Sequence, residues 1–267
     1  MEKVKPASFG SEAAWLDVAT GFHALRVFSP ETSGGLDRTI CYASKSSISI
    51  GVPPPGESPC VAVDGERGIV YPLNAQGLGD VPVRTLWFNV ALLALLLRGG
   101  LLVHAAGAVL KGRGLVFPAL SGTGKSTLSG LLEAEFPGSV VCDERIALRP
   151  DATPDEASPR WTLAGTPWSS SAGIARKTVA PLSAIVFLEQ APDCAIEPIP
   201  ASDAVRRMLP QISVDWKNPE LADRGVAALD ALLAAVPAYV FRFPKSPAAA
   251  RFIAAWAETL AGGVSKK

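Results

Sequence analysis

The chain has 267 residues, of which 48% are hydrophobic and 19% are charged, with 25 basic and 25 acidic side chains. This length accommodates one large α/β domain, or a core of about 150–180 residues with a smaller companion. The zero formal charge argues against a global field that would draw the chain onto nucleic acid or anionic lipid, so we expect any anion to be held by a local site.

The cysteines and the apolar segments indicate the cellular compartment of the protein. The four cysteines, Cys41, Cys60, Cys142 and Cys194, have neither metal-binding nor disulfide-framework spacing, which is typical of reduced thiols. The N-terminal residues lack the apolar segment of a secretory signal. The longest apolar run, Leu86–Leu97, is shorter than the ~20 residues that span a bilayer. We therefore expect a cytoplasmic protein with no membrane or nucleic-acid partner.

Two regions differ in their patterning. Residues 1–83 carry short β-type stretches between Pro, Gly and Ser clusters and predict a small β-rich N-terminal region, with a hairpin turn at Asp64-Gly65. Residues 84–267 alternate helix and strand patterns and predict an α/β domain. The elements expected there are a helix over Arg84–Leu97, strands over Leu101–Leu110 and Leu115–Phe117, a helix over Thr127–Phe136, strands over Ser139–Cys142 and Ala184–Leu188, helices over Ala201–Met208 and Gly225–Val236, a strand over Ala238–Phe243 and a helix over Ala248–Leu260.

A phosphate-loop pattern follows the second of these strands. Residues 119–127 read Ala-Leu-Ser-Gly-Thr-Gly-Lys-Ser-Thr and match GxxxxGK[ST], except that Ala119 replaces the first glycine. The loop glycines can turn successive N–H groups inward, and the following helix adds the positive end of its dipole. The strand–loop–helix context favours nucleotide binding over an inert glycine-rich turn. We expect Lys125 to contact the β- and γ-phosphates of ATP and Ser126 to bind Mg²⁺. The expected nucleotide site comprises Ser121, Gly122, Thr123, Gly124, Lys125, Ser126 and Thr127.

An acidic pair, Asp143 and Glu144, follows an apolar strand eighteen residues after Lys125. A carboxylate at a strand end beside a phosphate loop can help to bind Mg²⁺ or accept the proton of an attacking hydroxyl. The sequence predicts both roles for the pair but leaves open which carboxylate has which role. The alternative interpretation is an ordinary strand terminus at the surface.

His104 lies in an apolar strand pattern twenty-one residues before Lys125. If the two strands form a hairpin, this imidazole approaches the γ-phosphate side of the loop. A single histidine in an apolar stretch is more often a core residue than a catalyst, so its catalytic role is a hypothesis. We assign no role to the other histidine, His23.

The segment Leu163–Lys177 is rich in glycine, serine and basic residues, which is typical of a mobile loop over a phosphate site. Arg176 or Lys177 is a candidate basic finger that neutralises charge on the transferring phosphoryl group. A solvated loop with a tryptophan packed beneath it is the alternative. Arg206 and Arg207 are weaker candidates, because adjacent arginines on a helix usually face solvent.

The order of histidine, strand pair, phosphate loop and acid-ended strand over Leu101–Leu148 resembles HPr kinase/phosphorylase and the HPr-kinase-related kinases. The loop is also similar to that of ATP-dependent phosphoenolpyruvate carboxykinase, which shares the nucleotide-binding core. The resemblance implies an α/β fold with a P-loop kinase core of this type. It also implies that Asp143 takes the position of the catalytic aspartate, Glu144 that of its acidic neighbour and His104 that of the upstream histidine, beside a phosphate-binding Lys125.

The resemblance further implies an ATP- and Mg²⁺-dependent kinase acting on a serine-type hydroxyl of a peptide, a protein or a small molecule. Thr127 follows Ser126, so the glutamate-ended loop of the phosphorylase type is missing, and we do not expect phosphorolysis. The HPr-docking signature is not found either, so HPr is not the expected acceptor. A peptide or small protein is a candidate acceptor, because related kinases resemble partners of peptide-modifying gene systems. A small-molecule kinase and a nucleotide sensor or assembly protein without efficient transfer remain alternatives, and a homo-oligomer is left open.

Overall fold

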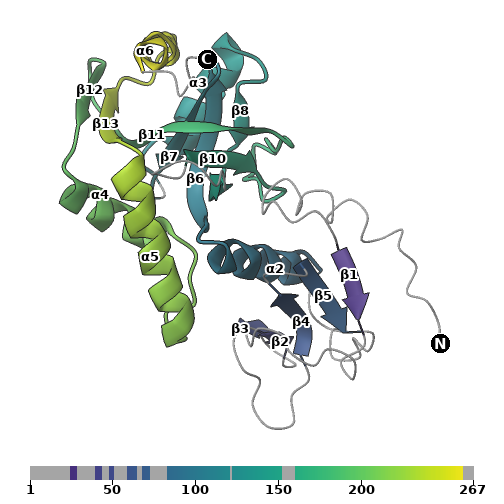
Figure 1. Cartoon of the computed structure of the whole chain (residues 1–267). Helices are drawn as coiled ribbons and strands as arrows, with labels where there is room; N and C mark the ends of the chain where they lie inside the picture. Colours follow the sequence, from purple (N-terminus) through teal and green to yellow (C-terminus); the bar gives the residue numbers. More distant parts are fainter. Residues whose placement is uncertain are drawn as a thin grey trace, which may run out of the picture.

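The structure is a computed structural model that describes residues 25–28, 40–43, 48–50, 59–64, 68–72, 83–120, 122–151 and 160–260. These residues form two β-sheets and five α-helices, in agreement with the mixed α/β class expected from the sequence (Figure 1). No helix in these ranges is long and apolar enough to cross a membrane.

The first sheet has five short strands in the order β1-β5-β4-β2-β3 and confirms the β-type stretches of the N-terminal region. Strands β4 and β5 are antiparallel, with Asp64 opposite Gly68, so the predicted hairpin is present. Strand β1 runs parallel to β5. The bounds are β1 Leu25–Phe28, β2 Ile40–Ala43, β3 Ile48–Ile50, β4 Pro59–Asp64 and β5 Gly68–Pro72.

Helix α2 (Val83–Leu97) lies between the two sheets and contacts both β4 and β6 (Figure 1). It ends as predicted, since Gly99 has a φ of 69° and the Gly100 N–H donates to the Leu95 carbonyl at 2.7 Å. The chain then turns directly into β6, the strand that carries His104.

The second sheet has eight strands, with seven in the order β10-β9-β6-β7-β11-β13-β12 and β8 paired to β6. Strands β7, β11 and β13 are mutually parallel, and the other pairs are antiparallel. Because β10 pairs with both β9 and β11, five strands form a closed circuit. The bounds are β6 Leu101–Leu110, β7 Arg113–Pro118, β8 Val140–Cys142, β9 Arg145–Asp151, β10 Arg160–Gly165, β11 Val179–Gln190, β12 Ala195–Pro198 and β13 Ala238–Phe243.

Helices cover both faces of this sheet and bury alternate residues of its strands. Phe117 of β7 packs in one core cluster with Leu128 of α3 and Ile253 of α6, whereas its neighbour Val116 belongs to the cluster that includes Leu93 of α2. The result is a layer of sheet between two layers of helices. The bounds are α3 Lys125–Glu135, α4 Ala201–Met208, α5 Pro219–Ala235 and α6 Pro247–Thr259.

Several elements differ from the sequence prediction. Strands β9, β10 and β12 were not predicted, and β11 begins well before Ala184. Helix α5 begins at Pro219 rather than Gly225, because the Asn218 side chain accepts hydrogen bonds from two N–H groups of the first turn, at 3.1 and 3.3 Å.

Candidate functional site

The phosphate-loop motif lies at the edge of the sheet where the parallel strands β7, β11 and β13 end. The loop leaves β7 directly, and residues from the other two strand ends contact it. The Gln190 side chain at the end of β11 donates to the Gly122 carbonyl at 3.4 Å. Phe243 at the end of β13 lies so close to Gly124 that an added Cβ there would be 2.9 Å from its ring. Carboxyl ends of parallel strands are the usual ligand edge of an α/β sheet.

The backbone of the loop needs its two described glycines. Gly122 has a φ of +87° and Gly124 a φ of +111°, both in the region that L side chains rarely adopt. Between them, the hydroxyl and N–H of Thr123 both donate to the Leu120 carbonyl, at 2.8 and 3.4 Å. Ala119, the departure from the motif, is buried in the core beside α3. The remaining predicted loop residue, Ser121, lies outside the described residues.

Helix α3 presents an uncapped N-terminus directly after this turn. Its first residue is Lys125, its first turn contains no acidic residue, and no described side chain caps it. Ser126 is exposed and Thr127 is half-buried. N–H groups of a first helical turn have no acceptor within the helix, and the helix dipole adds partial positive charge there. The local geometry therefore fits an anion such as a phosphate.

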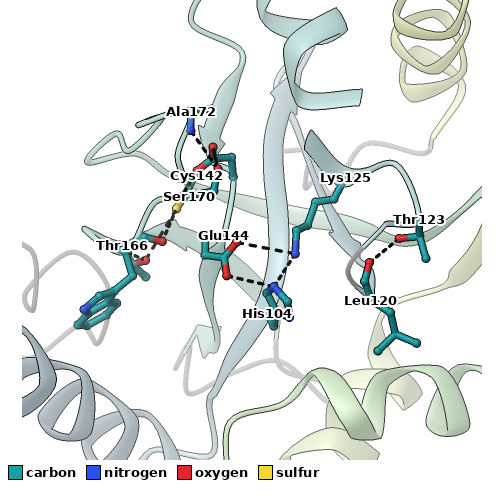
Figure 2. A network of polar contacts seen from close by, with 11 residues as sticks. His104, Leu120, Thr123, Lys125, Cys142, Glu144, Thr166, Ser170 and Ala172 are labelled. Atoms are coloured by element: carbon teal, nitrogen blue, oxygen red, sulfur yellow. Dashed lines mark hydrogen bonds and ion pairs between the residues drawn. The ribbon is translucent and has the colours of Figure 1, made fainter. Parts of the chain in front are cut away.

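Lys125, His104 and Glu144 form a compact cluster beside the loop (Figure 2). Lys125 is only 8% exposed, and its Nζ lies 2.6 Å from His104 Nε2. Glu144 Oε1 lies 3.1 Å from the same ring nitrogen, and its Oε2 lies 4.0 Å from Lys125 Nζ. The β6–β7 hairpin brings this about, because it pairs Ala105 with Pro118, the residue at which the loop region begins. His104 thus lies at the loop, as the hairpin arrangement predicts.

Burial and neighbouring charges shift the protonation of this cluster. Burial lowers the pKa of His104, the positive charges of Lys125 and Arg145 lower it further, and Glu144 opposes them. Burial also lowers the pKa of Lys125, with Glu144 again opposing the shift. An ammonium can only donate, so wherever Lys125 is protonated His104 Nε2 accepts from it and the imidazole is neutral. The cluster therefore holds one positive charge between a neutral ring and a carboxylate.

Asp143 is bound by a residue that the sequence analysis did not identify. Its carboxylate is completely buried and accepts two hydrogen bonds from Ser170, one from the N–H at 2.9 Å and one from the hydroxyl at 2.5 Å. Ser170 lies in the loop 166–178, which connects β10 to β11 and forms most of the segment predicted to cover the site. Ser170 stands in a run of three serines, but nothing in the pattern indicates which of them faces a carboxylate.

Further polar contacts join the start of this loop to strands β8 and β9, which flank Asp143 (Figure 2). The Thr166 hydroxyl donates to the Arg145 carbonyl at 2.7 Å, and the Cys142 thiol donates to the Trp168 carbonyl at 3.4 Å. Trp168 is buried and packs edge-on against Phe88 of α2. A packed tryptophan beneath the loop was one of the two sequence interpretations, and it is confirmed.

The candidate basic residues are engaged elsewhere. The Arg176 guanidinium donates to Glu133 at 2.7 and 3.1 Å and also to the Val140 carbonyl. Glu133 lies about 12 Å along α3 from Lys125, at 1.5 Å per residue. In this arrangement Arg176 joins α3 to β8 and does not reach the N-terminus of the helix. Lys177 is exposed, and the weaker candidate Arg207 pairs with Glu189 at 2.9 Å.

The predicted Mg²⁺ ligands do not form a complete metal site by themselves. Within the described ranges, no group of three or more His, Cys, Asp or Glu side chains could hold a metal ion. Ser126 and Glu144 remain accessible, whereas Asp143 is covered. Mg²⁺ commonly takes one or two protein oxygens and completes its shell with phosphate and water. The donor set present therefore fits Mg²⁺ bound together with a nucleotide.

Comparison with known proteins places these residues in a family. A family model described as SynChlorMet cassette protein ScmC matches residues 83–243, which is more than half of the chain. The match includes α2, the phosphate loop, His104, Asp143, Glu144 and the loop 166–178. No curated protein matches the chain. The chain therefore belongs to the SynChlorMet cassette protein ScmC family.

Proposed function

We propose that this protein is an ATP- and Mg²⁺-dependent phosphotransferase that transfers the γ-phosphate to a serine-type hydroxyl of a peptide, a protein or a small molecule. One observation carries the proposal. A lysine begins an uncapped helix after a two-glycine turn, and its amine lies 2.6 Å from a histidine and 4.0 Å from a glutamate. Phosphoryl transfer needs positioning and charge neutralisation, and this arrangement supplies both.

The described residues fit the triphosphate of ATP. Gly122 lies in open space, and the N-terminus of α3 offers N–H donors with no competing acidic group in its first turn. Lys125 would exchange His104 and Glu144 for phosphate oxygens, which are better partners for a partly buried ammonium. Ser126 and Glu144 would hold Mg²⁺, which supplies charge neutralisation on the β- and γ-phosphates when bound.

The geometry favours one division of roles between the two carboxylates. Glu144 is 31% exposed and lies beside the Lys125 amine, where a carboxylate can face a metal ion. Asp143 is buried and already accepts a hydrogen bond from a hydroxyl. A general base must lie within hydrogen-bond reach of the proton that it removes. We assign Glu144 to the metal and Asp143 to the proton of the acceptor.

The same residues support a relationship to the HPr-kinase-related kinases and a P-loop kinase core of the HPr kinase/phosphoenolpyruvate carboxykinase type. The support is the order of His104 on β6, the loop after β7 and the acidic pair after β8. Such a relationship makes a protein or peptide hydroxyl the first acceptor to test.

The first experiment is to incubate the purified chain with γ-labelled ATP and Mg²⁺, with and without extract from its source. Transfer of label to a discrete acceptor, absent in Asp143→Asn and in Lys125→Ala, would support the proposal. Ser171→Ala is a matched control, because Ser171 is exposed and has no contact with Asp143. The proposed function would be refuted if the wild-type chain neither bound nor turned over ATP.

A second function, nucleotide sensing or assembly without efficient transfer, is favoured by the covering of Asp143. Asp143 is completely buried, and both of its carboxylate oxygens accept hydrogen bonds from Ser170, so no external hydroxyl reaches them in this conformation. Tight Mg-ATP binding with no transfer to any acceptor, including the chain itself, would favour this second function.

A further inference from the structure

The contact between Ser170 and Asp143 has the chemistry expected for an acceptor on its base. The Ser170 hydroxyl donates its proton to Asp143 Oδ2 at 2.5 Å, and its N–H donates to Oδ1 at 2.9 Å. The Ser170 Oγ also accepts a hydrogen bond from the Ala172 N–H at 3.2 Å. A hydroxyl has one proton and two lone pairs. The proton of Ser170 points at the carboxylate and one lone pair accepts from Ala172, so one lone pair is left for attack.

The segment that carries Ser170 is short and anchored at both ends. On one side Trp168 is buried, and on the other Ala175 pairs with Cys142 next to Asp143. Between these anchors, the tip at residues 171–173 is exposed, and Gly173 has a φ of +72°. The anchors hold Ser170 at Asp143, while the exposed tip leaves room for the segment to shift.

The carboxylate that binds Ser170 also belongs to the electrostatic surroundings of the phosphate-binding lysine. Asp143 precedes Glu144, whose side chain contacts both Lys125 and His104. Burial lowers the pKa of Lys125 and the negative charge of Asp143 opposes that shift, so the Ser170 hydroxyl donates to a carboxylate that acts electrostatically on the amine proposed to bind the γ-phosphate.

We infer that Ser170 is a phosphoryl acceptor in cis, so that the protein modifies its own loop. This inference rests on the proposed function. The Ser170 Oγ forms a bond to the γ-phosphorus as the bond from that phosphorus to ADP breaks, the hydroxyl proton passes to Asp143, and ADP leaves. The phosphoserine carries about −1.5 to −2 charges, which repel the carboxylate once its proton is lost. The loop then leaves Asp143 and opens it to an external hydroxyl.

The test uses the full chain, incubated with Mg²⁺ and γ-labelled ATP and then digested with trypsin. Cleavage after Arg160 and Arg176 releases the peptide Trp161–Arg176, and fragmentation mass spectrometry assigns its phosphate to one hydroxyl. We expect phosphate on Ser170, at a rate per molecule that is unchanged when the protein is diluted tenfold. We expect Ser170→Ala to lose it, Ser170→Thr to restore it at threonine, and Ser171→Ala to retain it. Asp143→Asn should slow modification by ~10²-fold or more.

The outcomes separate this inference from the function on which it rests. If the wild-type chain binds ATP and labels another acceptor while Trp161–Arg176 stays unmodified, the inference is wrong and the proposed function stands. If the rate of peptide modification per molecule rises with protein concentration, the transfer occurs between molecules, and the inference of transfer in cis is wrong. If the chain neither binds nor consumes ATP, both proposals fail. Thermal unfolding and Mg-ATP titration of Ser170→Ala show whether that variant is folded, and the threonine variant gives an independent result.

Discussion

Replacing Arg176 with methionine tests whether this arginine stabilises the fold through Glu133 or acts as a basic finger on a transferring phosphoryl group. In the structure its guanidinium makes two hydrogen bonds to Glu133 and one to the Val140 carbonyl. A hydrogen bond to a charged group contributes about 1.5–3 kcal/mol when well buried. Because the Arg176 side chain is 36% exposed, solvent screens the pair, and we expect a total loss of about 2 kcal/mol in unfolding free energy. This corresponds to a fall in Tm of about 4–8 °C for a chain of this size.

The difference in Tm between wild type and Arg176→Met should depend on pH, because Arg176 pairs with the carboxylate of Glu133. Burial raises the pKa of its carboxyl, but hydrogen bonds from the Gly138 N–H and from Arg176 outweigh burial, and the pKa is lowered overall. A carboxyl with a lowered folded-state pKa stabilises the protein above its unfolded pKa of about 4.3, and the contribution is lost as pH falls through the folded value. Thermal unfolding should therefore show a difference between wild type and Arg176→Met at pH 7 that narrows below about pH 4. Equal Tm values together with a large loss of phosphoryl transfer would refute the structural role.

Three further predictions concern the site. Lys125→Ala should weaken Mg-ATP binding by ~10²-fold in calorimetric titration, and unchanged affinity would contradict the phosphate role. Asp143→Asn should keep nucleotide affinity but lose transfer by ~10²-fold or more, and normal turnover would remove its assigned role. The chain has only two histidines, so an NMR titration with His23→Gln as reference reports His104 alone. The pKa of His104 should rise in Lys125→Met and fall further in Glu144→Gln, because lysine is among the causes that lower it and glutamate opposes them. If the pKa of His104 shifted in the same direction in both variants, Lys125 and Glu144 would not have the opposing effects on His104 that the structure indicates.

The sequence predicted those elements whose signals are local. The Gly99-Gly100 stop, the β6–β7 hairpin and the helix after the loop, predicted from Thr127 and found from Lys125, each depend on residues near one another in the chain. Strands β9 and β10 were missed because their pairing joins residues on either side of the polar, proline-containing segment 152–159, which does not indicate the register of the strands that flank it. The sequence analysis placed the start of helix α5 at Gly225, after the true start at Pro219. In the structure this glycine lets α5 approach Val214, which an added Cβ would meet at 2.6 Å.

The arrangement of the candidate site was predictable around the loop 119–127 and not where loop 166–178 covers Asp143. Lys125, Ser126 and the acidic pair have motif spacing, and hairpin geometry then brings His104 to the lysine. The engagement of Asp143 by Ser170 joins residues far apart in sequence, and it depends on how loop 166–178 folds over β8. The ion pair between Arg176 and Glu133 likewise depends on the path of that loop. Composition alone could therefore not distinguish a basic finger from a structural ion pair.

The 2.6 Å contact between Lys125 and His104 would couple the proposed anion binding to protonation of the histidine. While the ammonium points at Nε2, that nitrogen cannot take up a proton, although Glu144 lies 3.1 Å away and would stabilise one there. When a bound anion draws the lysine away and screens its charge, the imidazole gains the freedom to become cationic beside the carboxylate. Under the proposed function, affinity for the anion would then be coupled to proton uptake, and the number of protons on the three side chains would depend on whether the loop is occupied.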